Sequence, residues 1–508
     1  MADETPRLDL NTYKQGDTDW DHTDTVEALD EHAIARGPIE ERPAEGDYDD
    51  ELYYATDQRI LWGWDADTGD WTARGGLGSE NDPVPGTTYR DAVSTAELND
   101  VVWVREGDDP QERLDEPPED GTVVFDGSHT FVVGDLEITT DGLTVVEPNL
   151  KRQDDYLDDE ELPVLTVTGD DVTLVRPRID GNRQGQGSPD SYKWSSDIEI
   201  HSAERVTVQG ARLQNSARHG ILVVGNPGPV RDTTIIDTVV DSPLRYGVSL
   251  EGRGTHQDST VITTRAYESV GRSTLEVNDG VEGAHVINTY GEGHLAESDG
   301  GVAAVVTVDD HGGPDQGNRD IVIDGVWGRE VDELVFTGTT EVADHHNITF
   351  RNVSGPITST NQIRHISDLT IENWTFEEPE TGGQPMALWV HSCDGVEIDG
   401  VAFEDPRMGE LMRIDNCNDV IVTNVSLPEG VPNAPNDMEG IRYRVTEDDD
   451  FSDIQFHHNR LREVPGRSIF FQDFSSSGSL DYIMATNNYG DITDTVGVAE
   501  KVIDDNLD

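Results

Sequence analysis

A short alternating pattern recurs along most of this chain and limits its fold more than any other feature. The pattern is an aliphatic residue, any residue, an apolar residue, any residue, and then Asn or Gly, as in Ile-Thr-Phe-Arg-Asn at 348–352. This alternation is typical of a strand with one buried face, and the closing Asn or Gly suits a bend through left-handed backbone angles. Close and looser copies begin, 21 to 37 residues apart, at Val206, Thr234, Thr260, Ala284, Ile321, Ile348, Leu369, Val396, Val420 and Ile454.

Repeats of this length indicate a solenoid, in which each repeat buries its apolar face by stacking on its neighbours. A second aliphatic run follows about half a repeat later, at 220–224, 247–250, 302–308, 387–390 and 469–471. Every copy therefore carries at least two strands, which predicts an all-β parallel β-helix. A leucine-rich repeat has a similar length, but its Leu-x-x-Leu-x-Leu spacing is absent from the sequence.

The charge of the chain is extreme, with 35 basic and 104 acidic residues and a formal net charge of −69. Such self-repulsion destabilises a compact state unless salt screens it. Lysine is rare, and this acid-rich, lysine-poor composition resembles the proteins of extreme halophiles, especially haloarchaea. Nucleic acid is not an expected partner, because phosphate binding needs a basic surface.

The sequence predicts neither membrane insertion nor export by a secretory signal. It holds no run of 18 apolar residues, and its first residues contain neither a basic nor an apolar signal region. We therefore expect the protein to reach the outside another way, such as assembly into a virion that lysis releases.

The N-terminal part predicts three segments before the solenoid. Residues 1–42 are expected to form an attachment arm with a short helix over 25–34, and residues 43–84 a small β module with a turn at Asp65–Asp70. The turn carries several aspartates, but it lacks the glutamate that an EF-hand calcium loop requires, so we predict no metal there. Residues 85–150 are expected to form a cap and the first coils, with a short helix after Tyr89.

Two resemblances refine this division of the chain. The motif Tyr-Tyr-Ala-Thr-Asp…Leu-Trp…Trp-Asp…Trp at 53–71 resembles a module of bacteriophage tail fibres and spikes. From Val164 to Tyr489 the chain resembles the pectin-lyase-like right-handed β-helices, which implies a right-handed solenoid over 151–490 and a C-terminal tail over 491–508. That fold hosts lyases, hydrolases, adhesins and viral tailspikes, so it does not fix the function.

One acidic segment is a candidate for catalysis. Asp309, Asp310 and His311 lie in the longest gap between repeats and offer two carboxylates beside an imidazole. Adjacent acids also arise by chance among 104 acidic residues, and a solvated loop explains them as well. The set of motifs found in polygalacturonase relatives is absent, so the sequence indicates no confident catalytic residue and no cofactor.

A row of arginines is a candidate for binding a glycan or receptor. Arg218, Arg245 and Arg272 stand 12, 11 and 12 residues after their repeat starts, so they should stack on one face of successive coils. Together with His219 and Tyr246 they could contact an anionic sugar. Alternatively, the arginines neutralise acids on neighbouring coils. Three further aromatic residues lie near bends, where core packing explains each as well as exposure does: Trp327, Trp374 and Tyr443.

Two other sets of residues fall at equivalent positions of different coils. Cys393 and Cys417 each precede a strand start by three residues, which fits either a disulfide or two stacked buried thiols. Four Asn-x-Ser/Thr sequons are better explained by asparagines that bond to the neighbouring coil than by glycosylation, and they begin at Asn347, Asn352, Asn373 and Asn424.

Together these features predict a tail fibre or tailspike of a haloarchaeal tailed virus, located in the virion tail after assembly in the host cytoplasm. By resemblance, the arm would join other tail or baseplate proteins, and a homotrimer of β-helices would bind a host surface glycan or S-layer glycoprotein. The alternatives are a polysaccharide lyase or glycoside hydrolase on the same scaffold and a structural spacer of the virion.

Overall fold

The computed structural model describes four strands between residues 35 and 76 and most of residues 101–503. Besides a few single residues, the gaps in the second range fall at 118–120, 158–161, 187–194, 295–302, 311–316, 340–344, 378–385, 430–434, 447–450, 474–481 and 495–499. The chain divides into two compact units, Met1–Asn99 and Asp100–Asp508.

The first unit contains a four-stranded sheet in the order β1-β2-β3-β4. Strand β3 runs antiparallel to both β2 and β4, and the turn expected at Asp65–Asp70 joins two paired strand ends. Strand β1 pairs in parallel with β2, so residues assigned to the arm also belong to this sheet. The helix expected over 25–34 lies outside the described residues, and the domain boundaries stay predictions. The strands are β1 (Ala35–Gly37), β2 (Leu52–Ala55), β3 (Ile60–Asp65) and β4 (Asp70–Gly76).

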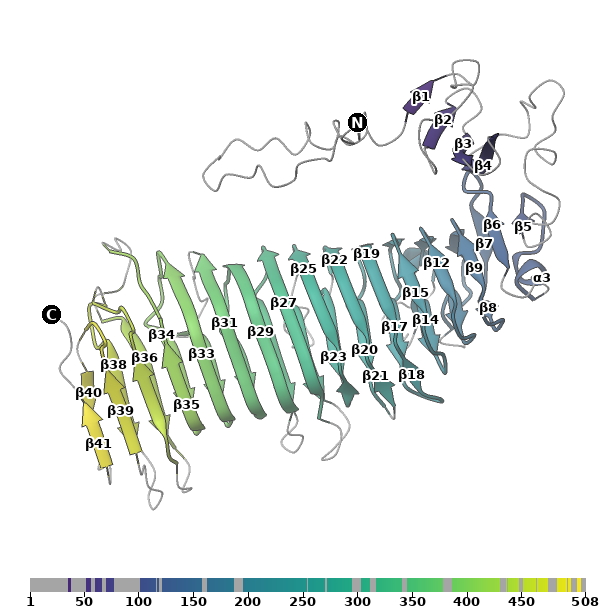
Figure 1. Ribbon diagram of the computed structural model, residues 1–508. Helices are drawn as coiled ribbons and strands as arrows, with labels where there is room; N and C mark the ends of the chain where they lie inside the picture. The colour runs from purple at the N-terminus through teal and green to yellow at the C-terminus, as the bar shows by residue number, and fades with distance from the viewer. Residues whose placement is uncertain are drawn as a thin grey trace, which may run out of the picture. The chain divides into compact units, whose positions relative to one another are not determined.

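The second unit is the right-handed parallel β-helix that the repeat and its resemblance predict. Its described strands form two sheets in which every pairing is parallel, and Figure 1 shows them stacked in chain order. The 14-stranded sheet contains β8 (Leu136–Ile138), β11 (Leu165–Val167), β14 (Ser196–His201), β17 (His219–Val224), β20 (Tyr246–Glu251), β23 (Leu275–Asn278), β26 (Ala304–Asp310), β28 (Glu333–Thr339), β30 (Asn361–Arg364), β32 (Met386–His391), β34 (Glu410–Asp415), β36 (Glu439–Val445), β38 (Ile469–Asp473) and β40 (Ile492–Asp494).

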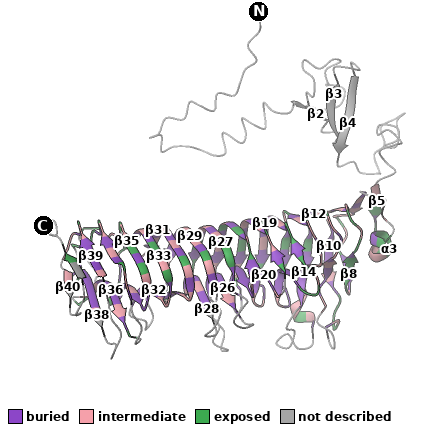
Figure 2. Cartoon of the chain, turned by 60° about the horizontal axis from the view of Figure 1, so that its bottom comes forward, coloured by how far each residue is buried: buried purple, intermediate pink, exposed green. Residues whose placement is uncertain are grey.

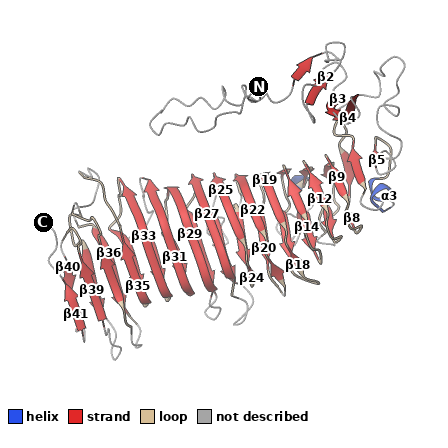
Figure 3. Cartoon of the chain, viewed as in Figure 1, coloured by secondary structure: helices blue, strands red, loops and turns tan. Residues whose placement is uncertain are grey.

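The second sheet of the solenoid has 23 described strands and carries the repeated sequence pattern (Figure 3). Its strands are β5 (Val101–Val104), β6 (Thr122–Phe125), β7 (Phe131–Val133), β9 (Thr144–Val146), β10 (Asn149–Arg152), β12 (Thr173–Val175), β13 (Arg178–Asp180), β15 (Thr207–Gln209), β16 (Arg212–Gln214), β18 (Val230–Arg231), β19 (Thr234–Asp241), β21 (His256–Gln257), β22 (Thr260–Tyr267), β24 (Val281–Glu282), β25 (His285–Glu292), β27 (Arg319–Arg329), β29 (His345–Pro356), β31 (Ile366–Glu377), β33 (Asp394–Glu404), β35 (Asn418–Thr423), β37 (Ile454–His457), β39 (Tyr482–Thr486) and β41 (Glu500–Ile503).

In most repeats the bend is made where the sequence places Asn or Gly, and in the three looser copies Asp237, Thr263 and His458 take this position. Asn352, Asn373 and Asn424 all have φ near +55°, the left-handed region that these residues tolerate best. Their side chains also join coils, since Asn352 Nδ2 donates to Asp324 Oδ1 over 2.6 Å and Asn424 Nδ2 to Asp399 Oδ1 over 2.6 Å. The expected bonding of these asparagines to the neighbouring coil is therefore confirmed.

Aliphatic residues in register fill the space between the sheets. In the 23-stranded sheet, Ile321, Ile348, Leu369 and Val396 follow one another in adjacent strands, and all are at most 1% exposed. Cys393 and Cys417 do stack on adjacent coils, but as free buried thiols and not as a disulfide. Trp374 and Tyr443 are fully buried, whereas Trp327 is 40% exposed.

The short helix α3 (Pro110–Asp115) covers the first strand of the 14-stranded sheet. Its Leu114 is buried, and its Gln111 imitates a neighbouring strand, because the side chain donates to Glu137 O over 3.0 Å and accepts from Glu137 N over 2.8 Å. This contact satisfies the edge strand β8, which is the role expected of a cap. The helix follows β5, while the segment after Tyr89 lies outside the described residues. No helix in the described part is long and apolar enough to cross a membrane.

A set of buried asparagines, which the sequence did not single out, ties three coils together. Asn361 accepts hydrogen bonds from Leu334 N and Val335 N, both over 2.9 Å, and donates to Ala387 O over 3.3 Å. Asn459 likewise accepts from Val425 N and donates to Asn488 Oδ1. These amides satisfy backbone groups at places where the sheet pairing is interrupted.

Replacing Asn361 with Ala is expected to lower the free energy of unfolding by about 2 kcal/mol or more, because two buried N–H donors lose their acceptor. Chemical denaturation followed by circular dichroism measures this change. Asn373→Gly is the matched control, since Asn373 is exposed and Gly tolerates its φ of 55°. Equal stability of the Asn361 variant and the native protein would contradict the assigned role.

Candidate functional site

The strands β17, β20 and β23 are buried along their whole length, although only one side of each faces the core (Figure 2). The core side carries the aligned residues Ile221, Val248 and Leu275. The other side carries polar residues in two rows that continue onto β26. The first row is Ser249, Glu276 and Thr307, and the second is Glu251, Asn278 and Asp309. We call these two rows the buried polar face, because its Ser, Glu and Asn side chains are at most 3% exposed.

The arginine row lies beside the buried polar face, and its members stack on successive coils. Arg245 N donates to Arg218 O over 2.9 Å, so these residues occupy adjacent coils. Arg245 and Arg272 each stand three residues before the paired Val248 and Leu275, which places Arg272 in the next coil of the same row. Arg218 and Arg245 are half-buried, and burial together with the charge of Arg245 lowers the pKa of Arg218 to about 10.

Aromatic rings connect the arginine row to the carboxylates. His219 stacks on Tyr246 with ring centroids 5.4 Å apart, and Arg218 Nε donates to His219 Nε2 over 3.1 Å. Arg272 Nη1 donates to the Tyr246 hydroxyl over 2.9 Å. Burial, followed by the surrounding arginine charges, holds the pKa of His219 well below its usual value, so the imidazole is neutral and can accept this hydrogen bond.

Glu251 of the buried polar face resists ionisation. Burial and the charge of Glu276 raise the pKa of Glu251 to about 8, even though Arg253 Nε lies 3.0 Å from Glu251 Oε2. Burial also raises the pKa of Tyr246 well above its usual value, and the charge of Glu276 adds to this effect. Ser249 Oγ donates to Glu276 Oε2 over 2.7 Å. The face thus combines carboxyl groups, a phenol and guanidinium groups in one shielded environment.

The catalytic candidates are separated by the strand geometry. Asp309 and Asp310 are consecutive on β26, so their side chains leave opposite faces of the strand. Asp309 belongs to the buried polar face and pairs with Gly338 of the next coil. A Cβ atom added to Gly338 would lie only 2.7 Å from Asp309 Oδ1, so the glycine leaves room for this carboxylate. Asp310 is 1% exposed, and His311 lies outside the described residues. The structure therefore brings Asp309, but not the Asp309–Asp310 pair, to the site.

Sequence reasoning missed most of the buried polar face. The runs Gly247–Leu250 and Val302–Val308 were interpreted only as core strands, and Glu276 was not considered. The available signal was a polar residue at alternate positions of 248–251 and 275–278, as Ser249 and Glu251 show. In a strand packed on one side only, such residues point away from the core, and nothing in the local sequence shows that they are also shielded from solvent.

The described residues contain no group of three or more His, Cys, Asp or Glu side chains placed to hold a metal ion. The side chains of the buried polar face offer two kinds of chemistry. Arginines can bind carboxylate or hydroxyl groups, and a carboxyl group with a pKa near 8 can donate or accept a proton near neutral pH.

Comparisons with known proteins leave the function open. No known family profile matches the chain, and no curated protein sequence is similar to it. Solved structures with partial similarity include the Dettilon tailspike protein, with 14% identity, 71% of this chain and 70% of that chain covered, and a TM-score of 0.47. The pre-mature bacteriophage phi29 gene product 12 has 11% identity to this chain, with 75% of this chain and 62% of that chain covered and a TM-score of 0.44. The A-module of mannuronan C-5 epimerase AlgE6 from Azotobacter vinelandii has 13% identity, with 76% of this chain and 88% of that chain covered and a TM-score of 0.38.

Glu251→Gln is expected to change how stability depends on pH. The pKa of Glu251 is about 8 in the folded protein against an ordinary 4.5, so the native state holds a proton that the unfolded chain has lost. The stabilisation present below pH 4.5 is lost as the pH rises towards 8. The Gln side chain stays neutral at every pH. Between pH 4.5 and 8 the free energy of unfolding of the variant should therefore rise relative to that of the native protein by at least about 1 kcal/mol.

Denaturation at a series of pH values measures this difference, and the exposed Glu397→Gln is the control. A Glu251 variant that is less stable by the same amount at every pH would show instead that the carboxylate is ionised and paired with Arg253 throughout.

Proposed function

We propose that this protein is a tail fibre or tailspike of a haloarchaeal tailed virus, and that it binds a host surface glycan or S-layer glycoprotein. The observation that carries the proposal is the combination of two parts in one chain. A small β sheet over 35–76 contains the motif that resembles tail-fibre modules, and a long parallel β-helix follows it. The net charge of −69 supports a host that lives in high salt.

In this proposal the two parts have different tasks. The N-terminal arm joins other tail or baseplate proteins, and the β-helix, as a homotrimer, carries the receptor-binding surface. A rigid solenoid suits this task because its side chains repeat at the spacing of neighbouring strands, about 4.8 Å, and can contact a long ligand at several points. Arg218 and Arg245, half-buried and held beside Tyr246, are the residues proposed to bind the glycan.

A second candidate function, polysaccharide cleavage, is favoured by one observation. Glu251 and Glu276 are buried together next to Tyr246, and the raised pKa of Glu251 suits a general acid or base near neutral pH. In this alternative the same arginines would position an acidic sugar. Release of reducing ends or of unsaturated sugars, abolished in Glu276→Gln, would make this the preferred function.

Replacing both Arg218 and Arg245 with Ala is expected to weaken attachment to haloarchaeal cells at least about ten-fold, because two charge-assisted contacts are lost. Sedimentation of labelled protein with cells in about 1 M salt, where the Debye length is about 3 Å, measures attachment while screening the chain's own repulsion. The exposed Arg407→Ala is the control. Unchanged attachment of the double variant would remove the arginine row from the receptor site.

Deleting residues 1–34 is expected to prevent incorporation into virus particles while leaving the β-helix folded. The deletion stops before β1, so the strand that pairs with β2 is kept. Immunoblotting of purified particles measures incorporation, and circular dichroism of the truncated protein checks folding. Truncated protein found in particles at the normal level would contradict the attachment role of the arm.

A further inference from the structure

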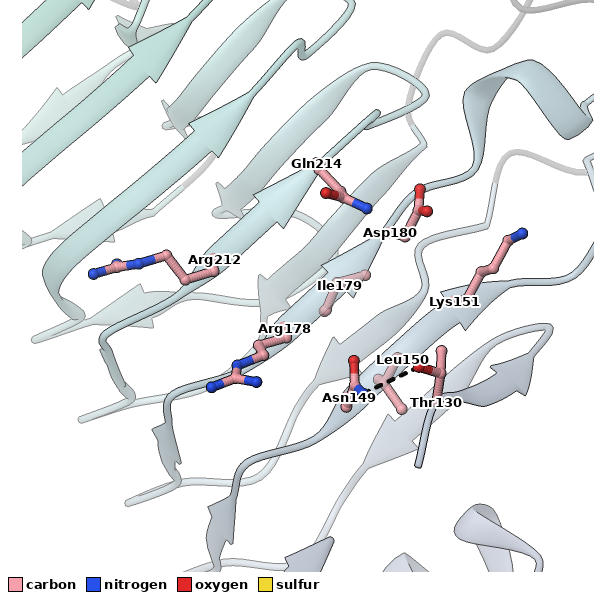
Figure 4. Close-up of a pocket in the computed structure, with 9 residues that line it drawn as sticks. All are labelled: Thr130, Asn149, Leu150, Lys151, Arg178, Ile179, Asp180, Arg212 and Gln214. Carbon is pink, nitrogen blue, oxygen red and sulfur yellow. Dashed lines mark hydrogen bonds between the residues drawn. The ribbon is translucent and has the colours of Figure 1, made fainter. Parts of the chain in front are cut away.

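An open groove of about 380 Å³ lies on the outer face of the 23-stranded sheet, near the start of the solenoid. Strands β10, β13 and β16 line it, together with Thr130, which precedes β7. Figure 4 shows the guanidinium groups of Arg178 and Arg212 extending to one side of the strands, with Lys151 on the other side. This groove is on a different sheet from the buried polar face.

The rows of residues that line the groove continue along the solenoid. Strand register aligns one row from residue 149 to residue 327 and a second row beside it, and we call the two rows together the outer track. The first row is Asn149, Arg178, Arg212, Val239, Arg265, Tyr290 and Trp327. The second row is Lys151, Asp180, Gln214, Asp241, Tyr267, Glu292 and Arg329. With seven strands about 4.8 Å apart, the track spans roughly 29 Å.

The far end of the outer track is aromatic. Tyr290 stacks on Trp327 with centroids 4.6 Å apart and planes 14° apart, and Tyr267 meets Tyr290 edge-on at 5.8 Å. Trp327 is 40% exposed, which makes it one of the few large apolar side chains of the described residues that remain open to solvent. The hydroxyl of Tyr290 donates to Glu292 Oε2 over 2.5 Å, which fixes the ring in place. Core packing, one of the two explanations open for Trp327 at the sequence level, therefore does not account for it.

The outer track is locally cationic in a strongly acidic protein. It contains five basic side chains, Lys151, Arg178, Arg212, Arg265 and Arg329, and three acidic ones, Asp180, Asp241 and Glu292. Arg178 and Arg265 are exposed, and neither forms an ion pair with a described residue. Arg212 Nη1 donates to Asp237 O over 2.8 Å and to Ala211 O over 2.9 Å, and Arg212 Nη2 lies 3.5 Å from Asp237 Oδ2. Arg329 lies 3.9 Å from both Glu292 and Glu330. Arg178 and Arg265 are thus the two arginines of this surface that are available to an external anion.

We infer that the outer track binds a chain-like anionic polysaccharide, one that bears carboxylate or sulfate groups, laid parallel to the solenoid axis. Arginine guanidinium groups recognise such anions with paired hydrogen bonds, and the rings of Tyr290 and Trp327 offer apolar surface to sugar rings. The polar residues Asn149 and Gln214 supply further hydrogen bonds to hydroxyl groups. This site is separate from the receptor site proposed on the other sheet, and it does not depend on whether the protein belongs to a virus.

A second copy of the chain is the competing occupant of this surface. A polysaccharide fits better because the cations and rings follow a narrow line over seven coils, whereas an interface between folded proteins needs a broad patch with an apolar centre. Val239 is the one aliphatic residue in the two rows.

The test measures binding of the full-length protein to polygalacturonate, alginate, hyaluronate and chondroitin sulfate by isothermal titration calorimetry, at the lowest salt that keeps the protein folded. Methyl-esterified polygalacturonate is the uncharged comparison. At least one polyanion is expected to bind, and Trp327→Ala and the double variant Arg178→Ala with Arg265→Ala should each weaken binding at least about ten-fold. The esterified polymer should bind at least about ten-fold more weakly than polygalacturonate if polygalacturonate is a ligand.

Matched controls separate the outer track from other surfaces. Trp103→Ala removes an equally exposed Trp, and Arg319→Ala removes an exposed Arg of β27 outside the two rows. Both should bind normally. Attachment of the Arg218 and Arg245 double variant to cells is measured separately, so failure of the proposed receptor site would be distinguished from failure of the outer track. The inference is overturned if no polyanion binds, or if the outer-track variants bind as the native protein does. It is also overturned if Trp327→Ala dissociates an oligomer in light scattering without altering glycan binding.

Discussion

Parallel pairing between successive coils is the constraint on which the rest of the structure depends. Each coil satisfies its backbone only by bonding to the coils before and after it, at a spacing of about 4.8 Å. Residues at equivalent positions must therefore lie in rows, whether they are core residues such as Ile348 and Leu369, bend residues such as Asn352 and Asn373, or arginines. Because strand pairing aligns core residues from coil to coil, it also aligns any binding residues on the surface of successive coils.

The two outer surfaces use this repetition in different ways. On the 14-stranded sheet, carboxyl groups such as Glu251 and Glu276 are shielded from solvent, which raises the pKa of Glu251 and favours specific contacts with neighbouring arginines and Tyr246. On the 23-stranded sheet, Arg178 and Arg265 stay open to solvent and the chain offers an exposed stack of Tyr290 and Trp327. Within a protein of net charge −69, several cations of this sheet thus lie in register along one line.

The fold could be predicted from the sequence because each coil of the solenoid repeats the same short pattern of residues. The strand starts, the bends at Asn352 and Asn424, and the stacking of Arg218 with Arg245 all follow from counting residues between repeats. It was insufficient for the buried polar face and the outer track, since the burial of Glu276 and the exposure of Trp327 depend on coils and turns remote in sequence. Asp309 shows the same limit, because its neighbours across the sheet, Asn278 and Gly338, come from other repeats.

We propose that glycan contacts this protein across several stacked coils and not at the tip of a single loop. Electron cryo-microscopy of the protein bound to glycan released from haloarchaeal envelopes tests this claim most directly. We expect glycan density that follows the rows beside Arg218 and Arg245 and extends over at least two coils. Density confined to one loop, or glycan held only at the first unit before residue 100, would contradict it.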